Sequence, residues 1–233
     1  MSAPRFDAVL LDAGGVLVLP DPLVLGPLLA YYGGDDSVET HTRAHYAGMR
    51  AKSAVGSGER DWGDYDRTYV ETVGVDPADT EEAVEVLGRT RFHATWRYVI
   101  EESRSALDRM ADAGVPMGVV SNASGQIEAM LARSICQVGP GDHVEMRVVV
   151  DSEVVGVAKP DPAVFEFALP AFSEFERSRI AYVGDSVTMD VEGARAAGLH
   201  PLLLDPYDDH AGAEFERIRS LHELADEFSS RTP

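Results

Sequence analysis

The chain has 233 residues and carries 40 acidic against 20 basic side chains, a formal net charge of −20 at pH 7. A surface that follows nucleic-acid phosphates or binds an anionic membrane needs basic patches, so we expect neither nucleic acid nor a membrane as a partner. The hydrophobic share of 45% predicts a substantial core, and the single cysteine permits no internal disulfide. With no apolar run of ~18 residues and no leader pattern, we expect a soluble cytoplasmic protein.

Short apolar runs bounded by turn residues predict a series of strands. In chain order they are Phe6–Leu11, Val115–Val120, Arg147–Val150, Ile180–Val183 and His200–Leu204. Their continuous apolar character is typical of strands covered on both faces. Amphipathic patterns predict core helices at residues 103–113, 126–134, 162–169, 190–197 and 213–228. This alternation predicts an α/β fold, with a three-layer Rossmann-like parallel sheet and right-handed crossovers.

One long segment, residues 18–114, interrupts the alternation and shows no convincing strand. Its patterns predict helices at residues 23–32, 36–54, 61–73 and 78–92. We therefore expect residues 1–17 and 104–233 to form the α/β core. Residues 18–103 are expected to form an all-helical cap domain inserted after the first strand.

Polar side chains that can carry chemistry follow the predicted strands. In chain order they are Asp12, then Ser121 and Asn122, then Lys159, then Asp185 and Asp190. Because ligands of open parallel sheets gather at the carboxyl ends of the strands, we expect these side chains to converge at one edge. Only Lys52 and Lys159 are lysines among the 20 basic residues, so each invites a specific role.

The segments VVSN, GVAKPDPAVF and YVGDSVTMDVEGARAAG, together with Asp12, resemble the four motifs of the haloacid dehalogenase superfamily in its phosphatase-type members. The resemblance covers Phe6–Leu17 and Leu107–Pro206, and the helical insert takes the place of that superfamily's helical cap of the C1 type. It implies a hydrolase that uses Mg²⁺ to release phosphate from a small phosphorylated metabolite, through an aspartyl-phosphate intermediate.

The resemblance also implies a role for each residue at the strand ends. Asp12 would be the nucleophile that attacks phosphorus. Ser121 and the backbone amide of Asn122 would hold the phosphoryl oxygens. Lys159 would neutralise both the Asp12 carboxylate and the phosphoryl group.

A Mg²⁺ site is implied at the same edge. Its ligands would be the Asp12 carboxylate, the backbone carbonyl of Gly14 and the Asp185 carboxylate, which are the oxygen donors that this hard cation prefers. Asp190 is expected to be either a second-shell partner that orients Lys159 or a further ligand, with a plain helix N-cap as the alternative.

The sequence departs from the phosphatase pattern at Gly14, where those enzymes carry the acid that protonates the leaving group. The acid is then water or a cap side chain, or the chain belongs to a branch without it. Metal-independent 2-haloacid dehalogenases lack the acid, but they also lose the metal-binding residue, which Asp185 retains. Phosphonatases lack it too and use a cap lysine, here Lys52, but they carry arginine where Lys159 stands. A catalytically impaired binding module is a further alternative.

The cap is expected to act as a lid over the site, which suits a small phosphate ester as substrate. His41 and His45 lie four residues apart on one helical face, and we expect an ordinary helix surface there rather than a metal site. Lys52 is likewise expected to be solvated. The helical spacing of Trp62, Tyr65 and Tyr69 indicates internal packing of the cap.

Overall fold

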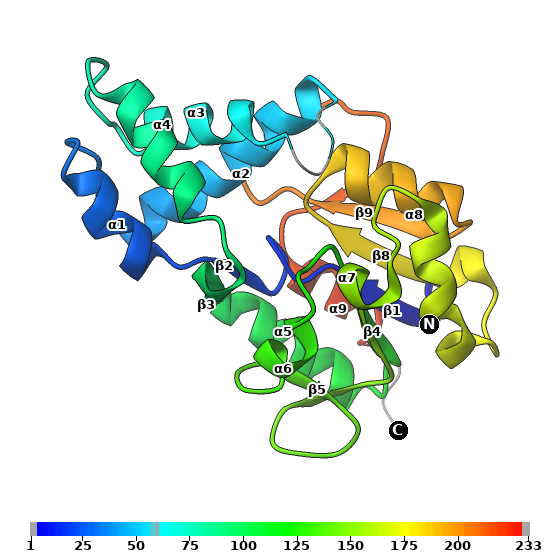
Figure 1. Ribbon diagram of the computed structural model, residues 1–233. Helices are drawn as coiled ribbons and strands as arrows, with labels where there is room; N and C mark the ends of the chain where they lie inside the picture. The colour runs from blue at the N-terminus through cyan, green and yellow to red at the C-terminus, as the bar shows by residue number, and fades with distance from the viewer. Residues whose placement is uncertain (1–3, 57, 59–60, 230–233) are drawn as a thin grey trace.

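The computed structural model describes residues 4–56, 58 and 61–229 of the chain. Within them lies a six-stranded parallel sheet of order β10-β9-β8-β1-β4-β7 (Figure 1). Its strands are β1 (Ala8–Leu11), β4 (Met117–Ser121), β7 (Val149–Asp151), β8 (Ile180–Gly184), β9 (His200–Leu204) and β10 (Arg217–Ile218). The first five confirm the predicted strands, and the α/β, Rossmann-like fold class is confirmed. The outermost residues of the expected core segments, 1–3 and 230–233, lie outside the described part.

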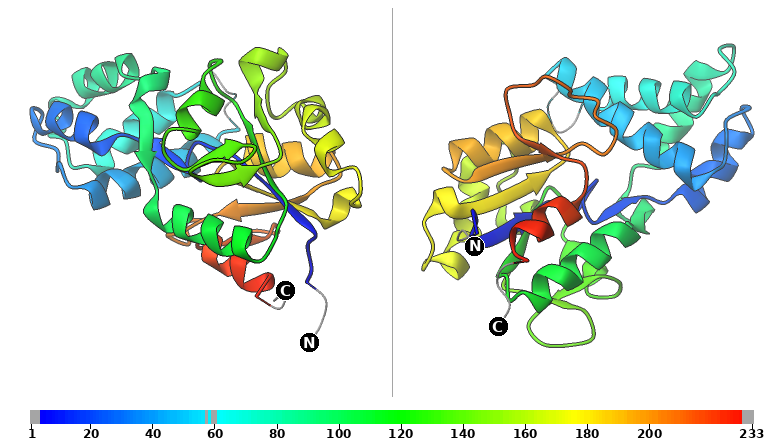
Figure 2. Two further views of the ribbon diagram at one scale, coloured as in Figure 1. Left: turned by 90° about the horizontal axis from the view of Figure 1, so that it is seen from below. Right: turned by 180° about the vertical axis from the view of Figure 1, so that it is seen from behind.

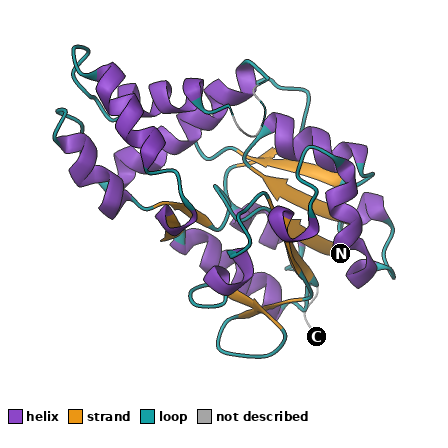
Figure 3. Cartoon of the chain, viewed as in Figure 1, coloured by secondary structure: helices purple, strands orange, loops and turns teal. Residues whose placement is uncertain are grey.

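Both faces of the sheet are covered, as Figures 2 and 3 show. In β1, Val9 and Leu11 belong to one buried cluster together with residues of α5 (Glu101–Asp112) and α9 (Leu221–Glu227). Ala8 and Leu10 belong to a second cluster on the opposite face. Because both faces of each strand are buried, the strands read as continuous apolar runs rather than as alternating patterns.

The second face is covered by short helical segments. They are α7 (Ser152–Val155), the 3₁₀ segments Pro162–Phe167 and Leu169–Phe172, and the π-helical turn Val187–Glu192, which continues into α8 (Gly193–Ala196). The other side also carries α6 (Ile127–Leu131) and a small parallel pair, β5 (Cys136–Val138) and β6 (Val144–Met146). The helix predicted at 162–169 is therefore present as 3₁₀ segments, and the helix predicted at 190–197 as a π-helical turn followed by α8.

The predicted helix at residues 213–228 is wrong in its first half. There the chain forms a loop and then β10, and α9 begins only at Leu221. The physical reason is Asp205, whose carboxylate accepts hydrogen bonds from the backbone N–H groups of Asp209 and His210 and pairs with Arg217 at 2.8 Å. These contacts fix a loop where the apolar spacing alone suggested a helix.

The segment between β1 and α5 contains α1 (Pro22–Ala30), α2 (Val38–Ala54), α3 (Gly63–Thr72) and α4 (Thr80–Arg89), close to the four predicted helices. These helices group together on one side of the molecule (Figure 1). The expectation that the segment has no strand is wrong. Val18–Pro20 (β2) pairs antiparallel with Trp96–Val99 (β3) where the chain leaves and re-enters the core. Each strand is too short to produce a pattern by itself.

Tyr65 and Tyr69 pack inside the group formed by α1 to α4, as expected, with 3% and 1% of their surface exposed. Trp62 packs against the same cluster. Among the described helices, none is both long enough and apolar enough to cross a membrane.

Candidate active site

The carboxyl ends of β1 and β8 bring three carboxylates and one ammonium together. One oxygen from each of Asp12, Asp185 and Asp190 lies within 4.8 Å of the others. The Lys159 Nζ atom lies 2.8 Å from Asp12 Oδ2 and 2.7 Å from Asp190 Oδ1. The structure thus brings together four residues that the sequence placed at separate strand ends.

The charges of this cluster shift the pKa of the groups within it. Burial raises the pKa of Asp12 to about 7; Lys159 opposes this rise, and the nearby Asp190 and Asp185 add to it. Burial lowers the pKa of Lys159, but the Asp12 and Asp190 carboxylates outweigh it, so the net shift is upward. Lys159 is therefore a permanent cation in this site.

Asp190 is fully occupied by contacts within the chain. Its Oδ1 atom accepts from Lys159, and its Oδ2 atom accepts from the backbone N–H of Ser186 at 2.9 Å. Asp190 is also buried, with 1% of its surface exposed. Its carboxylate therefore holds the Lys159 ammonium at a fixed place in the site. Of the three interpretations given for Asp190, these contacts favour the partner of Lys159. The N-cap interpretation is wrong, because the residue that caps the helical turn Val187–Glu192 is Ser186.

Tyr182 is a member of this network that the sequence analysis missed. Its hydroxyl accepts from Lys159 Nζ at 2.8 Å and lies 3.0 Å from both the Val120 carbonyl and Asp190 Oδ1. With one proton, it donates to one of these two at a time. The available signal was a tyrosine inside an otherwise apolar strand, because a buried hydroxyl needs polar partners.

Ser121 and Asn122 lie at the end of β4, next to β1 in the sheet. Ser121 is 3% exposed. The Asn122 side chain forms two hydrogen bonds with the backbone of Lys159. It accepts from the Lys159 N–H at 2.8 Å and donates to the Lys159 carbonyl at 3.0 Å. This clamp by the side chain is additional to the role expected for the Asn122 backbone amide.

The loop after Asp12 is packed tightly on two sides. Gly15 has a φ of +69°, and a Cβ there would lie 1.9 Å from Asp185 Oδ2. A Cβ on Gly14 would lie 3.1 Å from the Cζ3 atom of Trp96. Glycine is required at 15 by both conformation and space, whereas at 14 a Cβ would contact the Trp96 ring closely enough that the indole must shift slightly.

The expectation that His41 and His45 form an ordinary helix surface is wrong, because both are 1% exposed. His41 contacts the Tyr69 hydroxyl at 2.7 Å, within the insert. His45 contacts the Tyr65 hydroxyl at 2.9 Å through Nδ1 and Asp185 Oδ2 at 2.9 Å through Nε2. A helical pattern cannot reveal this burial, because it arises from tertiary contacts of α2: His41 is buried within the insert and His45 against the core.

Lys52 is also buried, at 2% exposure, so the expectation that it is solvated is wrong. Its ammonium lies 3.5 Å from the centroid of the Trp62 ring. This cation–π contact, together with the nearby carboxylate of Asp66, offsets the loss of water around the charge. Lys52 lies seven residues after His45, hence on the same face of α2.

Further contacts hold α2 against the core beside the carboxylate cluster. Arg43 forms a bidentate ion pair with Asp209 at 2.6 and 2.8 Å, and Arg50 Nε donates to the Asp209 carbonyl at 3.0 Å. The Tyr46 hydroxyl donates to the Gly15 carbonyl at 2.8 Å. The insert therefore contacts the loop that follows Asp12.

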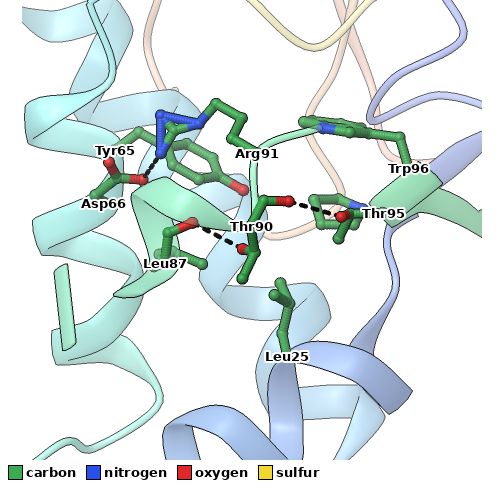
Figure 4. Close-up of a pocket in the computed structure, with 9 residues that line it drawn as sticks. Leu25, Tyr65, Asp66, Leu87, Thr90, Arg91, Thr95 and Trp96 are labelled. Carbon is green, nitrogen blue, oxygen red and sulfur yellow. Dashed lines mark hydrogen bonds and ion pairs between the residues drawn. The ribbon is translucent and has the colours of Figure 1, made fainter. Parts of the chain in front are cut away.

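A pocket is lined by Trp96 together with residues of the insert. Figure 4 shows the indole at one side of it and the ion pair of Arg91 with Asp66 at the other. Thr90 and Thr95 line the wall between them, joined by a hydrogen bond from Thr95 Oγ1 to the Thr90 carbonyl. Trp96 therefore lines this pocket and also lies next to Gly14.

Comparison with known proteins agrees with this fold and identifies a family. A family model described as haloacid dehalogenase-like hydrolase matches residues 6–198, more than half of the chain. A haloacid dehalogenase-like hydrolase domain-containing protein 3 from Bos taurus is 35% identical over 111 residues, which cover 48% of this chain and 41% of that protein. A phosphoserine phosphatase from Thermus thermophilus is 29% identical over 163 residues, covering 68% of this chain and 61% of that one. The matches thus span about half of the curated relatives' length.

A solved structure shares the fold over nearly the whole chain. The HAD-hydrolase YfnB from Bacillus subtilis, bound to magnesium, superposes with a TM-score of 0.58 at 17% identity, and the match covers 97% of this chain and 99% of that one. At this identity the likeness shows the fold alone. The match to the family model over residues 6–198 shows the family, and the chain belongs to the haloacid dehalogenase-like hydrolases.

Proposed function

We propose that this hydrolase is a Mg²⁺-dependent phosphatase of a small phosphorylated metabolite, with Asp12 as the nucleophile. The observation that carries the proposal is the placement of Lys159, 2.8 Å from Asp12 and 2.7 Å from Asp190. A buried ammonium at this point favours the ionised Asp12 and offers positive charge to an incoming phosphoryl group.

The carboxylate cluster is suited to a hard divalent cation. Three carboxylates face one lysine, so an uncompensated negative charge remains, and all the side-chain donors are oxygens. Asp12, Asp185 and the Gly14 carbonyl would hold the ion, while Asp190 is engaged with Lys159 and Ser186. When bound, Mg²⁺ supplies positive charge that stabilises the phosphoryl oxygens in the transition state.

Each residue of the site then has its own role in the reaction. An Asp12 oxygen forms a bond to phosphorus while the bond from phosphorus to the ester oxygen breaks. Ser121 and the Asn122 amide hold the phosphoryl oxygens, and Lys159 balances their charge. Water then attacks phosphorus and releases phosphate, which restores the Asp12 carboxylate.

Two of the proteins described above support this proposal. One is a phosphoserine phosphatase, so a relative similar over 68% of this chain acts on a small phosphorylated compound. The YfnB structure carries magnesium on the same fold. We propose the same cofactor and the same general substrate class for this chain.

One observation favours a second candidate, phosphonate hydrolysis through a Schiff base on a lysine of the insert. Lys52 is buried on the face of α2 that carries His45, which contacts Asp185. Borohydride reduction in the presence of a phosphonoaldehyde would leave a stable adduct on Lys52 if this chemistry occurs. No adduct, or the same adduct in Lys52→Arg, would exclude this candidate.

The phosphatase proposal is tested with a panel of phosphate esters at saturating Mg²⁺, using the wild type and Asp12→Asn. We expect phosphate release by the wild type, its loss with chelator and its absence in Asp12→Asn. Equal behaviour of the two proteins contradicts the proposal. Halide release from a 2-haloacid with chelator present would indicate a dehalogenase, and ligand-induced thermal stabilisation without turnover would indicate a binding module.

A further inference from the structure

The six-membered ring of Trp96 lies next to Gly14, the position two residues after Asp12. The atoms of Trp96 nearest to a Cβ built on Gly14 are Cζ3 at 3.1 Å, Cε3 at 3.4 Å and Cη2 at 3.8 Å. All three are carbons of the six-membered ring, so the indole N–H lies on the far side of the ring system. The surface offered at Gly14 is therefore apolar and donates no hydrogen bond.

The Trp96 indole is held in place by contacts with neighbouring residues. Trp96 begins β3, where it pairs with Pro20 of β2. Its ring packs edge-on against His45 and Trp62, with centroid separations of 5.6 and 6.4 Å. The pocket of Figure 4 is lined by Trp96, and a Cβ on Gly14 would require the indole to shift by a few tenths of an ångström.

The proton carriers around Gly14 that the structure describes each have partners already. His45 uses Nδ1 on the Tyr65 hydroxyl and Nε2 on Asp185. The Tyr46 hydroxyl donates its proton to the Gly15 carbonyl. Lys159 contacts Asp12, Asp190 and Tyr182, one acceptor for each of its three protons.

We propose, on the basis of the phosphatase function above, that the pair formed by Gly14 and Trp96 restricts the enzyme to phosphate donors whose leaving group departs as a stable anion. These are aryl phosphates, enol phosphates and acyl phosphates, in preference to phosphates of simple alcohols. Trp96 is then a specificity-determining residue.

The reaction balances without a proton donor for such substrates. The bond from Asp12 oxygen to phosphorus forms as the bond from phosphorus to the leaving oxygen breaks, and the electron pair of the broken bond stays on that oxygen. An aryloxide, enolate or carboxylate carries this charge easily, whereas an alkoxide needs a proton in the transition state. General acid catalysis contributes about 10²–10⁴-fold to the rate, so its absence should make alkyl phosphates slower than aryl, enol or acyl phosphates by a factor of this size.

The test measures kcat/KM for substituted phenyl phosphates, an acyl phosphate and several alkyl phosphates with the wild-type protein and Mg²⁺. We expect values for alkyl phosphates lower than those for the nitrophenyl ester by at least about 100-fold, with a steep dependence on leaving-group acidity across the phenyl series. A gap smaller than this, with a shallow dependence, overturns the inference, because it requires a proton donor at the leaving group. Absence of phosphate release from every substrate instead contradicts the phosphatase function itself.

A pair of double variants tests the role of Trp96. Gly14→Asp with Trp96→Ala places an acid in the space that the indole vacates, and Gly14→Asn with Trp96→Ala places an amide of the same shape there. We expect the first to narrow the gap between aryl and alkyl substrates by about tenfold or more relative to the second. Equal gaps in two folded variants count against the assignment to Trp96. If either variant fails to fold, the wild-type series still decides the inference.

Discussion

The Nε2 atom of His45 lies 2.9 Å from the Oδ2 atom of Asp185, so a side chain of α2 touches the carboxylate cluster directly. Both side chains are nearly fully buried, at 1% and 4% exposure. The insert therefore contributes a side chain that contacts the carboxylate cluster beside Asp12.

This relationship predicts different effects for two histidines of the same helix. His41→Ala and His45→Ala each remove a buried imidazole that contacts a tyrosine, so each should lower the free energy of unfolding by about 1–3 kcal/mol. Only His45 contacts the core, so only His45→Ala should lower kcat/KM, by about tenfold or more, because Asp185 loses its partner. Denaturant unfolding and phosphate release measure the two effects. An equal loss of activity in both variants would contradict a specific role for His45.

Replacement of Lys159 should be the most severe single change. Lys159→Gln leaves Asp12 and Asp190 facing each other without a cation, which should destabilise the protein by about 3–5 kcal/mol at neutral pH. Phosphate release should fall by about 10²–10³-fold. The comparison is Tyr182→Phe, which removes one hydroxyl from the same ammonium and should cost about 1 kcal/mol. Unfolding curves that rank these two variants in the opposite order would contradict the proposed network.

Gly15 should tolerate no side chain. Gly15→Ala would place a methyl group 1.9 Å from Asp185 Oδ2 and force alanine to adopt a φ of +69°. Gly114→Ala is the matched control, because φ is +67° there and nothing lies within 4 Å of the added carbon. We expect Gly114→Ala to lose about 1 kcal/mol of stability and Gly15→Ala to lose more, together with its activity. Similar melting temperatures and activities would mean that the loop moves away from Asp185 easily.

The pKa of Asp12 predicts a pH-dependent difference in stability. The folded protein raises this pKa from 3.8 to about 7, so between these values the folded state binds a proton that the unfolded chain has lost. The stabilisation from this group is complete at low pH and is lost as pH rises through the window. Without metal, the melting temperature of the wild type should therefore fall by a few degrees relative to Asp12→Asn between pH 4 and pH 7. A constant difference across this range would contradict the shift.

Much of the core could be predicted from the sequence because each feature is local. The five predicted strands of the sheet appear in the sequence as apolar runs. The strands that carry the site are followed by turns that contain a polar or charged side chain. Asp12, Lys159, Asp185 and Asp190 do converge, because parallel strands bring their carboxyl ends to one edge.

The contribution of the insert could not be predicted, because it depends on tertiary contacts. His45 and Lys52 are polar residues on a helix, and the helical pattern shows neither the contact of His45 with Asp185 of the core nor the contact of Lys52 with Trp62 within the insert. Trp96 lies 82 positions after Gly14 in the chain, and no periodicity links the two. The loop around Asp205 was missed because its side chain, rather than an apolar pattern, determines its shape.

The central claim is that Asp12 becomes covalently attached to phosphorus, and mass spectrometry of the acid-quenched enzyme tests it most directly. Wild-type protein mixed with Mg²⁺ and a nitrophenyl phosphate, then quenched within the first turnover, should yield a peptide containing Asp12 heavier by one phosphoryl group. Reduction with borohydride should convert that aspartyl-phosphate to homoserine. Rapid phosphate release with no modified peptide, or modification at a residue other than Asp12, would contradict the claim.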